Sequence, residues 1–259
     1  MSVLGVIMAG GRNTRYGEHK ALASVGGTRI LERVRAALAR VTPDVVLVAN
    51  EPAAYADSGL EQRPDVRPGA GALGGILTAV LWARDRGCPG ALVVACDMPF
   101  VSADLLAELV ARTGGTSPGT HPIVPVATLP SASTDTSPAA FTGMSPRAGP
   151  GAPGTVRNPA APMSLPDIVA AESGGRRGIE PLCAYYATSC LSAIERALDR
   201  GDRRVIAFFD ELRVDQMPLE QVRRFGEPEV LFLNVNTPEE RERAERIAGG
   251  TIDHAEVLP

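Results

Sequence analysis

The chain has 259 residues, of which 44% are hydrophobic, enough to bury a substantial core in one large α/β domain or two small ones. A formal net charge of -4 and a pI of about 5.5 argue against a general nucleic-acid partner or a membrane-surface partner. Four cysteines without a C-x-x-C spacing argue against a disulfide scaffold and favour a reducing cytoplasm, and no stretch reaches the roughly eighteen apolar residues of a membrane span.

The first predicted element is a strand at the N-terminus. Residues 3–9 form a nearly unbroken apolar run, as expected of a strand buried on both faces of a parallel sheet. At Gly10 and Gly11 the side chains vanish, so the backbone can turn sharply and its N–H groups can approach a ligand closely. Three cations follow within nine residues: Arg12, Arg15 and Lys20. The combination predicts a polyphosphate site, although its spacing fits neither a Walker loop nor the G-x-G-x-x-G dinucleotide fingerprint.

A helix and a second strand come next. Apolar residues at helical spacing across residues 28–41 alternate with charged ones and predict an amphipathic helix. Residues 45–49 are predicted to form a buried strand, which completes a βαβ unit with a right-handed crossover. Asn50 follows at the carboxyl end of that strand, where ligands collect in open parallel sheets. Two interpretations stay open: Asn50 shares the ligand edge with the glycine loop, or it only starts a turn.

Residues 63–76 form a second glycine-rich stretch, which leads into a helix predicted from about Gly74 to Arg84. Free N–H groups at a helix start, with no side chains in the way, favour a bound purine or phosphate. A purely structural turn is the alternative for such a stretch taken alone. Its recurrence after the first glycine loop favours a shared nucleotide site.

A third buried strand is predicted over residues 91–96, and it ends at Asp97. A carboxylate where an apolar strand meets solvent, at the ligand edge, suits Mg²⁺, which binds through one or two carboxylates plus substrate phosphates. The alternative is that Asp97 binds no metal and only forms part of the turn at the end of the strand. Ser102 is predicted to cap the helix that follows.

The composition changes abruptly over residues 118–166. This segment holds eleven of the chain's 22 prolines and only three charged residues. Such a sequence buries too little apolar surface to offset the entropy of ordering it, so we expect much of it to be a mobile loop. Residues 123–126 are predicted as a short edge strand, and whether the segment covers an acceptor site stays open.

The C-terminal part returns to regular patterns, with a strand predicted at 181–186 and a helix at about 189–200. Arg203 and Arg204 follow, either as ligands of an anionic phosphate or as a solvated surface pair. In the last stretch Asn234 and Asn236 lie two residues apart in an extended segment, so they point to the same side. The segment 237–240, Thr-Pro-Glu-Glu, predicts a capping box that opens the C-terminal helix.

Four motifs, in this order, resemble those of the molybdenum cofactor guanylyltransferase family, within the larger group of nucleotidyltransferases. The first loop is similar to the family signature Leu-Ala-Gly-Gly-x-Ser-x-Arg-Met-Gly-x-Asp-Lys, with departures at Thr14, Tyr16 and His19. The second resembles the family's Asp followed by Gly-Pro-Leu-Ala-Gly, the third its Cys-Asp-Thr/Met-Pro, and the last its terminal Asn-x-Asn-Thr-Pro-Glu-Glu. The resemblance covers residues 3 to about 112 and 181 to about 247.

The resemblance implies a reaction, the Mg²⁺-dependent transfer of GMP from GTP to the phosphate of molybdenum-bound molybdopterin, which yields the guanine dinucleotide cofactor and pyrophosphate. It implies catalytic roles for Lys20, Arg15 and Asp97, with Asp97 as the Mg²⁺ ligand. The implied nucleotide and pterin contacts are Met8, Ala9, Gly10, Gly11, Arg12, Lys20, Asn50, Asp65, Gly74, Asp97, Asn234 and Asn236. Expected partners are GTP, molybdenum-molybdopterin and, transiently, proteins that supply or receive the cofactor, with no nucleic acid and no membrane.

We therefore expect an α/β fold with three layers around a doubly wound, mostly parallel sheet of the Rossmann-like nucleotidyltransferase type. One domain is expected over residues 1–259, with an insertion at about 116–178. Two other functions stay open. One is a molybdenum cofactor cytidylyltransferase, a family that usually reads Ala-Ala-Gly where this chain has Ala9-Gly10-Gly11. The other is a noncatalytic nucleotide-binding module, which the departures from the family signature at Tyr16 and His19 leave open. An NAD-dependent oxidoreductase is disfavoured because the dinucleotide fingerprint is missing.

Overall fold

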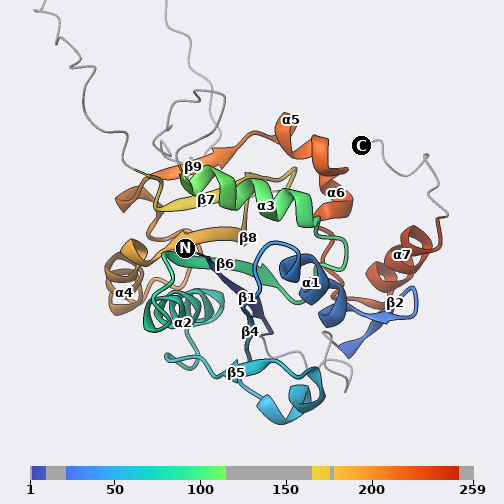
Figure 1. Cartoon of the computed structure of the whole chain (residues 1–259), viewed down its shortest axis with the longest axis horizontal. Coiled ribbons are helices and arrows are strands. Elements are labelled where there is room, and N and C mark those ends of the chain that lie inside the picture. The colour runs from blue at the N-terminus through green and yellow to red at the C-terminus, as the bar shows by residue number, and fades with distance from the viewer. Residues whose placement is uncertain (1, 10–21, 115–164, 176–177, 251–259) are drawn as a thin grey trace, which may run out of the picture.

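β1 (Leu4–Met8) lies inside a seven-stranded sheet and is buried along its whole length in the computed structural model of the chain (Figure 1). The structure describes residues 2–9, 22–114, 165–175 and 178–250. The strand order across the sheet is β5 (Glu61–Arg63), β4 (Val45–Val48), β1, β6 (Gly90–Ala95), β8 (Ile179–Ala187), β7 (Ile168–Glu172) and β9 (Val214–Met217). Neighbouring strands are parallel except where β8 pairs with β6 and β7. The prediction of a mostly parallel sheet is confirmed.

The three adjacent strands β4, β1 and β6 end at one level. Met8 pairs with Val48 of β4 on one side and with Ala95 of β6 on the other. The residues that follow these strands therefore emerge together, along an edge that we call the carboxyl edge. The predicted first, second and third strands are confirmed, each within a residue or two of its expected bounds.

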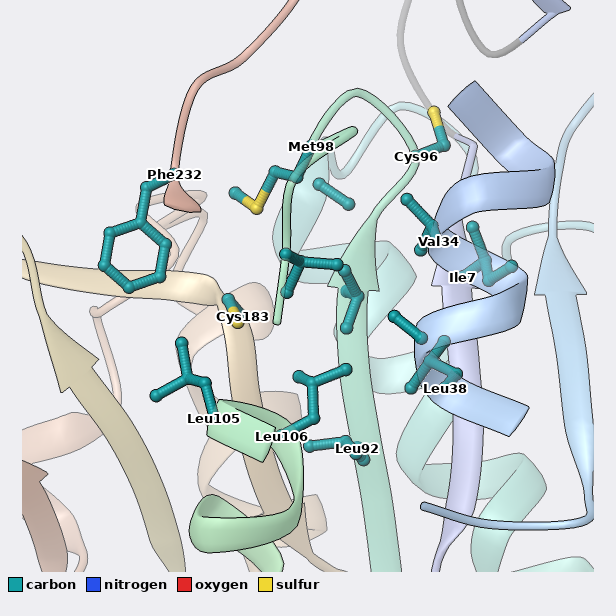
Figure 2. Packing of buried hydrophobic residues seen from close by; sticks show 14 of the residues in the cluster. Ile7, Val34, Leu38, Leu92, Cys96, Met98, Leu105, Leu106, Cys183 and Phe232 are labelled. Atoms are coloured by element: carbon teal, nitrogen blue, oxygen red, sulfur yellow. The ribbon is translucent and has the colours of Figure 1, made fainter. Parts of the chain in front are cut away.

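Helices cover both faces of the sheet, which confirms the three layers (Figure 1). The helices on one face are α1 (Ile30–Ala39) and α3 (Ala103–Ala111), and those on the other are α2 (Ala72–Asp85) and α4 (Leu191–Asp199). Side chains of β1 alternate between two apolar clusters, with Ile7 under α1 and Val6 under α2. Figure 2 shows Val34 and Leu38 of α1 packed beside Ile7.

The remaining described elements frame the carboxyl edge and the sheet ends. Apart from short 3-10 helices, they are the hairpin β2 (Ser24–Val25) and β3 (Thr28–Arg29), the short helices α5 (Leu219–Val222) and α6 (Pro228–Leu231), and the C-terminal helix α7 (Pro238–Ala248). Ser102 caps α3 through a hydrogen bond from Leu105 N, and Thr237 and Glu240 form the predicted capping box of α7. No helix in the described part of the chain is both long and apolar enough to cross a membrane.

The sequence patterns missed several strands. β5 reads Glu-Gln-Arg, a polar edge strand without an apolar run, and β9 alternates only weakly. β7 lies inside the range 116–178 that was expected to be an insertion, so the last part of that range belongs to the sheet because four of its five residues are buried. The predicted edge strand at 123–126 and most of that range lie outside the described residues.

Gly114 and Leu165, the described residues on either side of the segment 115–164, lie at the edge of the sheet opposite the carboxyl edge. Arg112, just before Gly114, donates to the carboxylate of Asp215 at 3.3 Å, and Asp215 is the second residue of β9. Leu165 comes three residues before the start of β7, which runs parallel to β9. Both ends are therefore at the edge where the parallel strands begin, opposite the edge that carries Asp97.

Asp167 ties three elements together at that opposite edge. Its buried carboxylate accepts hydrogen bonds from Arg213 Nε at 2.9 Å, from Arg213 Nη2 at 3.0 Å and from Ser189 Oγ at 2.5 Å. Burial by itself raises the pKa of this carboxyl, but the hydrogen bonds from Arg213 and Ser189 outweigh it and lower the pKa below its ordinary value.

We expect Asp167→Asn to lower the free energy of unfolding by about 1–3 kcal/mol at about pH 7, because Arg213 then lacks its charged partner. Since the folded-state pKa of Asp167 is lowered, its contribution is present above the unfolded pKa of about 4 and is lost as pH falls through the folded-state pKa. Urea unfolding at about pH 7 and about pH 3 should show the gap between wild type and variant shrinking.

Asp104→Asn is the matched control. Asp104 pairs with Arg40 at 3.2 Å, with the two side chains 72% and 68% exposed. Losing this pair should cost less than about 0.5 kcal/mol at any pH. Equal losses from the two variants would contradict a structural role for the Asp167 cluster.

Candidate functional site

The end of β1 is held between its two neighbours at the carboxyl edge. Ala9 N donates to Val48 O at 2.9 Å, and Cys96 N donates to Met8 O at 3.0 Å. The chain leaves β1 toward β4 on one side, whereas β6 lies on the other, so the strand order reverses here. In open α/β sheets the crevice at such a reversal, outside the carboxyl ends, is where ligands bind.

Five predicted site residues lie outside the described part of the chain: Gly10, Gly11, Arg12, Arg15 and Lys20. The described chain reaches Ala9 and resumes at Leu22, and both of these residues pack against the apolar cluster that contains α1. The described residues on either side of this loop are thus packed into the core on the same face of the sheet. The roles of the five residues stay predictions.

Asn50 and Asp65 form a reciprocal pair beside this edge. Asn50 Nδ2 donates to Asp65 Oδ2 at 2.8 Å, and Asp65 N donates to Asn50 Oδ1 at 2.8 Å. Asn50 comes two residues after β4 and Asp65 two residues after β5, so the contact joins the ends of two adjacent strands. The structure therefore brings the predicted residue Asn50 to the second glycine-rich stretch, with the Asp65 carboxylate held in one orientation.

The first turn of α2 approaches this segment closely. A Cβ on Gly74 would lie 2.8 Å from Ala70 Cβ and 3.1 Å from Arg67 O, both in the loop that leads into the helix. A Cβ on Gly75 would overlap Met8 Cε and would lie 3.5 Å from Asp65 Oδ1. The two glycines let the loop and β1 pack onto the start of α2. The sequence predicts that this stretch leaves room for a purine or phosphate; what the structure shows beside these two glycines is the loop and Met8, and the ligand contact stays a prediction.

Asp97 lies two residues after β6, at the same edge, with its side chain half-buried and Oδ1 fully buried. Its backbone oxygen accepts a hydrogen bond from Val235 N at 2.9 Å. This bond joins the third motif to the last one, although they are far apart in the sequence. The structure thus places the predicted metal ligand next to the predicted asparagine segment.

The asparagine segment lies between α6 and α7, outside any helix or strand. Val235 is buried, while Asn234 and Asn236 on either side of it are half-buried. Asn234 Nδ2 donates to Phe232 O at 3.2 Å, and Asn236 N donates to Glu240 Oε2 at 2.6 Å. Backbone contacts at both ends therefore fix the segment against Asp97 and the start of α7.

The arginine pair after α4 fits the surface interpretation. Arg204 binds Asp202 through its side chain at 2.7 Å and is 77% exposed, and the hydrogen bonds from Arg204 hold the pKa of Asp202 at about 2. Arg203 is exposed as well. Among the described residues, the hydrogen bonds that Arg204 donates all go to Asp202.

Within the described residues, no group of three or more His, Cys, Asp or Glu side chains is arranged to hold a metal by itself. Asp97 is a single carboxylate at the ligand edge, which is the donor set expected where substrate phosphates complete the coordination of Mg²⁺. All four cysteines are free thiols.

Fold and site together define a class: an α/β protein whose candidate site residues lie at the reversal point of a doubly wound, mostly parallel sheet. Comparison with known families is consistent with this class. The sequence pattern of the MobA-like NTP transferase domain family matches residues 5–216, and the chain belongs to that family. The family resemblance seen in the motifs is therefore confirmed.

Individual relatives extend over nearly the whole chain. A probable molybdenum cofactor guanylyltransferase from Pelotomaculum thermopropionicum is 29% identical over 96% of this chain and 94% of its own length. The crystal structure of molybdopterin-guanine dinucleotide biosynthesis protein A from Archaeoglobus fulgidus has a TM-score of 0.64 at 24% identity, covering 96% of this chain and all of the other. A cytidylyltransferase from Leptospira borgpetersenii shares the fold at a TM-score of 0.57 and 10% identity, covering 97% of this chain and 87% of its own. The fold alone therefore does not determine whether the nucleotide carries guanine or cytosine.

The close packing at α2 can be tested with its two adjacent glycines. We expect Gly74→Ala to destabilise the protein by about 1–2 kcal/mol, because the new methyl meets the backbone of the loop, and this outweighs the roughly 1 kcal/mol that alanine gains in a helix. Gly75→Ala should cost less, since the atom it meets is the flexible end of Met8. Urea unfolding of both variants measures the difference. A Gly74→Ala protein at least as stable as Gly75→Ala would contradict the described packing.

Proposed function

We propose that this protein transfers GMP from GTP to the phosphate of molybdenum-bound molybdopterin. A phosphate oxygen of the acceptor attacks the α-phosphorus of GTP, the bond between the α-phosphorus and the bridging oxygen breaks, and pyrophosphate leaves. Such a reaction requires that two anions are held in line and that developing charge is neutralised. The products are the guanine dinucleotide cofactor and pyrophosphate.

One observation carries this proposal: the hydrogen bond from Val235 N to Asp97 O. It joins the backbone of the segment that carries Asn234 and Asn236 to Asp97, two residues after β6, and we assign these asparagines to the acceptor. On the other side of β6 lies β1, which leads into the glycine loop. This supports a donor site on the β1 side of Asp97 and an acceptor site on the side of Asn234 and Asn236, since a group transfer needs two substrates bound side by side.

The nucleotide is assigned to the β1 side of this point. Backbone N–H groups of Gly10 and Gly11 would hold the phosphates, and Lys20, Arg12 and Arg15 would stabilise their charge. Asp65, oriented by Asn50, would hold the nucleoside part over the start of α2 at Gly74. Met8 and Ala9 would line the crevice floor between these groups.

Asp97 would hold Mg²⁺ together with the substrate phosphates. The fit rests on the position of Asp97 at the carboxyl edge and on the partial exposure of this residue. When bound, the ion supplies positive charge to the reacting phosphates. Asn234 and Asn236 would bind the pterin of the acceptor with amide groups that both donate and accept hydrogen bonds.

The names of relatives support the same chemistry, since the Pelotomaculum protein is described as a probable molybdenum cofactor guanylyltransferase and aligns over nearly the whole chain. Four free thiols favour a cytoplasmic location. Within this proposal, transient contacts with proteins that deliver or receive the pterin are expected.

The direct test is pyrophosphate release with molybdenum-molybdopterin as acceptor, measured with GTP and separately with CTP in the presence of Mg²⁺. We expect release with GTP only. A preference for CTP would identify a cytidylyltransferase with the same site. Tight GTP binding without release under all conditions would identify a noncatalytic nucleotide-binding module.

Asp97→Asn tests the metal assignment. The variant keeps the shape of the side chain and the backbone contact to Val235, so it should fold normally. We expect the rate of transfer to fall by at least about a hundredfold, since losing one preorganised charge contact typically costs about 3 kcal/mol. The exposed Asp104→Asn serves as control and should keep full activity. An Asp97→Asn protein with near wild-type transfer would contradict the assignment.

A further inference from the structure

Thr78 stands out among the described residues as a buried polar side chain that links two parts of the nucleotide side. It lies in the second turn of α2 and is 1% exposed. Its hydroxyl donates to Gly74 O at 2.9 Å within the helix and accepts a hydrogen bond from Val66 N at 3.0 Å. The first contact is common for threonine in helices, but the second reaches a segment outside the helix.

The contact to Val66 fixes the residue that directly follows Asp65. The Val66 side chain is 51% exposed, so its N–H points inward while its side chain faces out. The preceding N–H, that of Asp65, is held by Asn50 Oδ1 at 2.8 Å. Two consecutive N–H groups are thus bound from two different elements, the end of β4 and the middle of α2.

This double attachment leaves the Asp65 carboxylate little freedom. Its Oδ2 accepts from Asn50, and its Oδ1 lies 3.5 Å from the position that a Cβ on Gly75 would take, so it sits against the first turn of α2. Thr78 binds the same turn through Gly74 O. The Thr78 hydroxyl therefore fixes the position of the backbone next to Asp65 relative to the first turn of α2.

We infer that Thr78 is a positioning residue for the nucleotide, which acts through Asp65 rather than by touching GTP. The inference rests on the proposed function, in which Asp65 holds the nucleoside. Asn50 orients the carboxylate from the side of the sheet, and Thr78 orients it from the side of the helix. Removing the hydroxyl would release Val66 N and let Asp65 move away from the start of α2.

A double-mutant cycle on GTP affinity tests this inference. Thr78→Val replaces the hydroxyl by a methyl of similar size, and we expect it to weaken GTP binding about threefold to tenfold, the range of one lost hydrogen bond. In an Asp65→Asn background, which keeps the side-chain shape, the same substitution should change the affinity less than about twofold. Thr78→Ser keeps the hydroxyl and should bind GTP like wild type.

The matched control is Thr42→Val. Thr42 is also 1% exposed and donates through its hydroxyl to Val3 O at 2.7 Å, but it lies before β4, at the edge opposite the site. The Thr42→Val protein should lose stability as the Thr78→Val protein does, but it should keep the wild-type affinity for GTP. If Thr78→Val does not fold, Thr78→Ala removes the same hydroxyl without adding a methyl and enters the same cycle.

The outcomes distinguish an error in the proposed role of Asp65 from an error in the positioning role of Thr78 alone. An Asp65→Asn protein that binds GTP as wild type does would contradict the assignment of Asp65 in the proposed function and, with it, the role of Thr78. If Asp65→Asn weakens binding but Thr78→Val does not, or if Thr78→Val weakens it equally in both backgrounds, the positioning role alone is wrong.

Discussion

The hydrogen-bonded register of β1 between β4 and β6 is the constraint on which the rest of the structure depends. Because Met8 pairs with Val48 on one side and with Ala95 on the other, three strands end at one level. All five residues of β1 are buried, so the strand cannot slip without exposing its side chains to water or moving them to the wrong face. The common level of these strand ends therefore follows from the packing of the core.

Main-chain hydrogen bonds, more than side-chain contacts, assemble the site. Cys96 N binds Met8 O, Ala9 N binds Val48 O, and Val235 N binds Asp97 O. Backbone groups are present whatever the side chain, so this framework can be kept while the side chains at the edge diverge. That is consistent with solved structures that share the fold at low identity, a cytidylyltransferase among them. In the proposed function, side chains such as Asn50 and Asp65 then decide what the site binds.

Much of this arrangement could be predicted from the sequence, for identifiable reasons. β1, β4 and β6 are continuous apolar runs, and α1 and α7 carry strong periodicity or capping signals. β5 was missed because its three residues are polar, and β7 because its short apolar run follows a proline-rich stretch. The spacing of apolar residues therefore does not predict β5 or β7.

The site was predictable in the same uneven way. Asn50 and Asp97 follow apolar strands, so their shared edge could be inferred from the order of the elements. Thr78 gave no signal, since a threonine on a helix is ordinary until its partner at Val66 is known. Tertiary hydrogen bonds of this kind depend on how a loop folds back, which local sequence patterns do not encode.

The measurement that tests the central claim most directly is the fate of labelled phosphate during a single turnover with molybdenum-molybdopterin. If the crevice aligns the acceptor with the α-phosphorus, label from the α-position of GTP should appear in the pterin product, while label from the γ-position should appear only in pyrophosphate. Transfer of γ-label to the pterin, or bound GTP and acceptor without any transfer of α-label, would contradict the account.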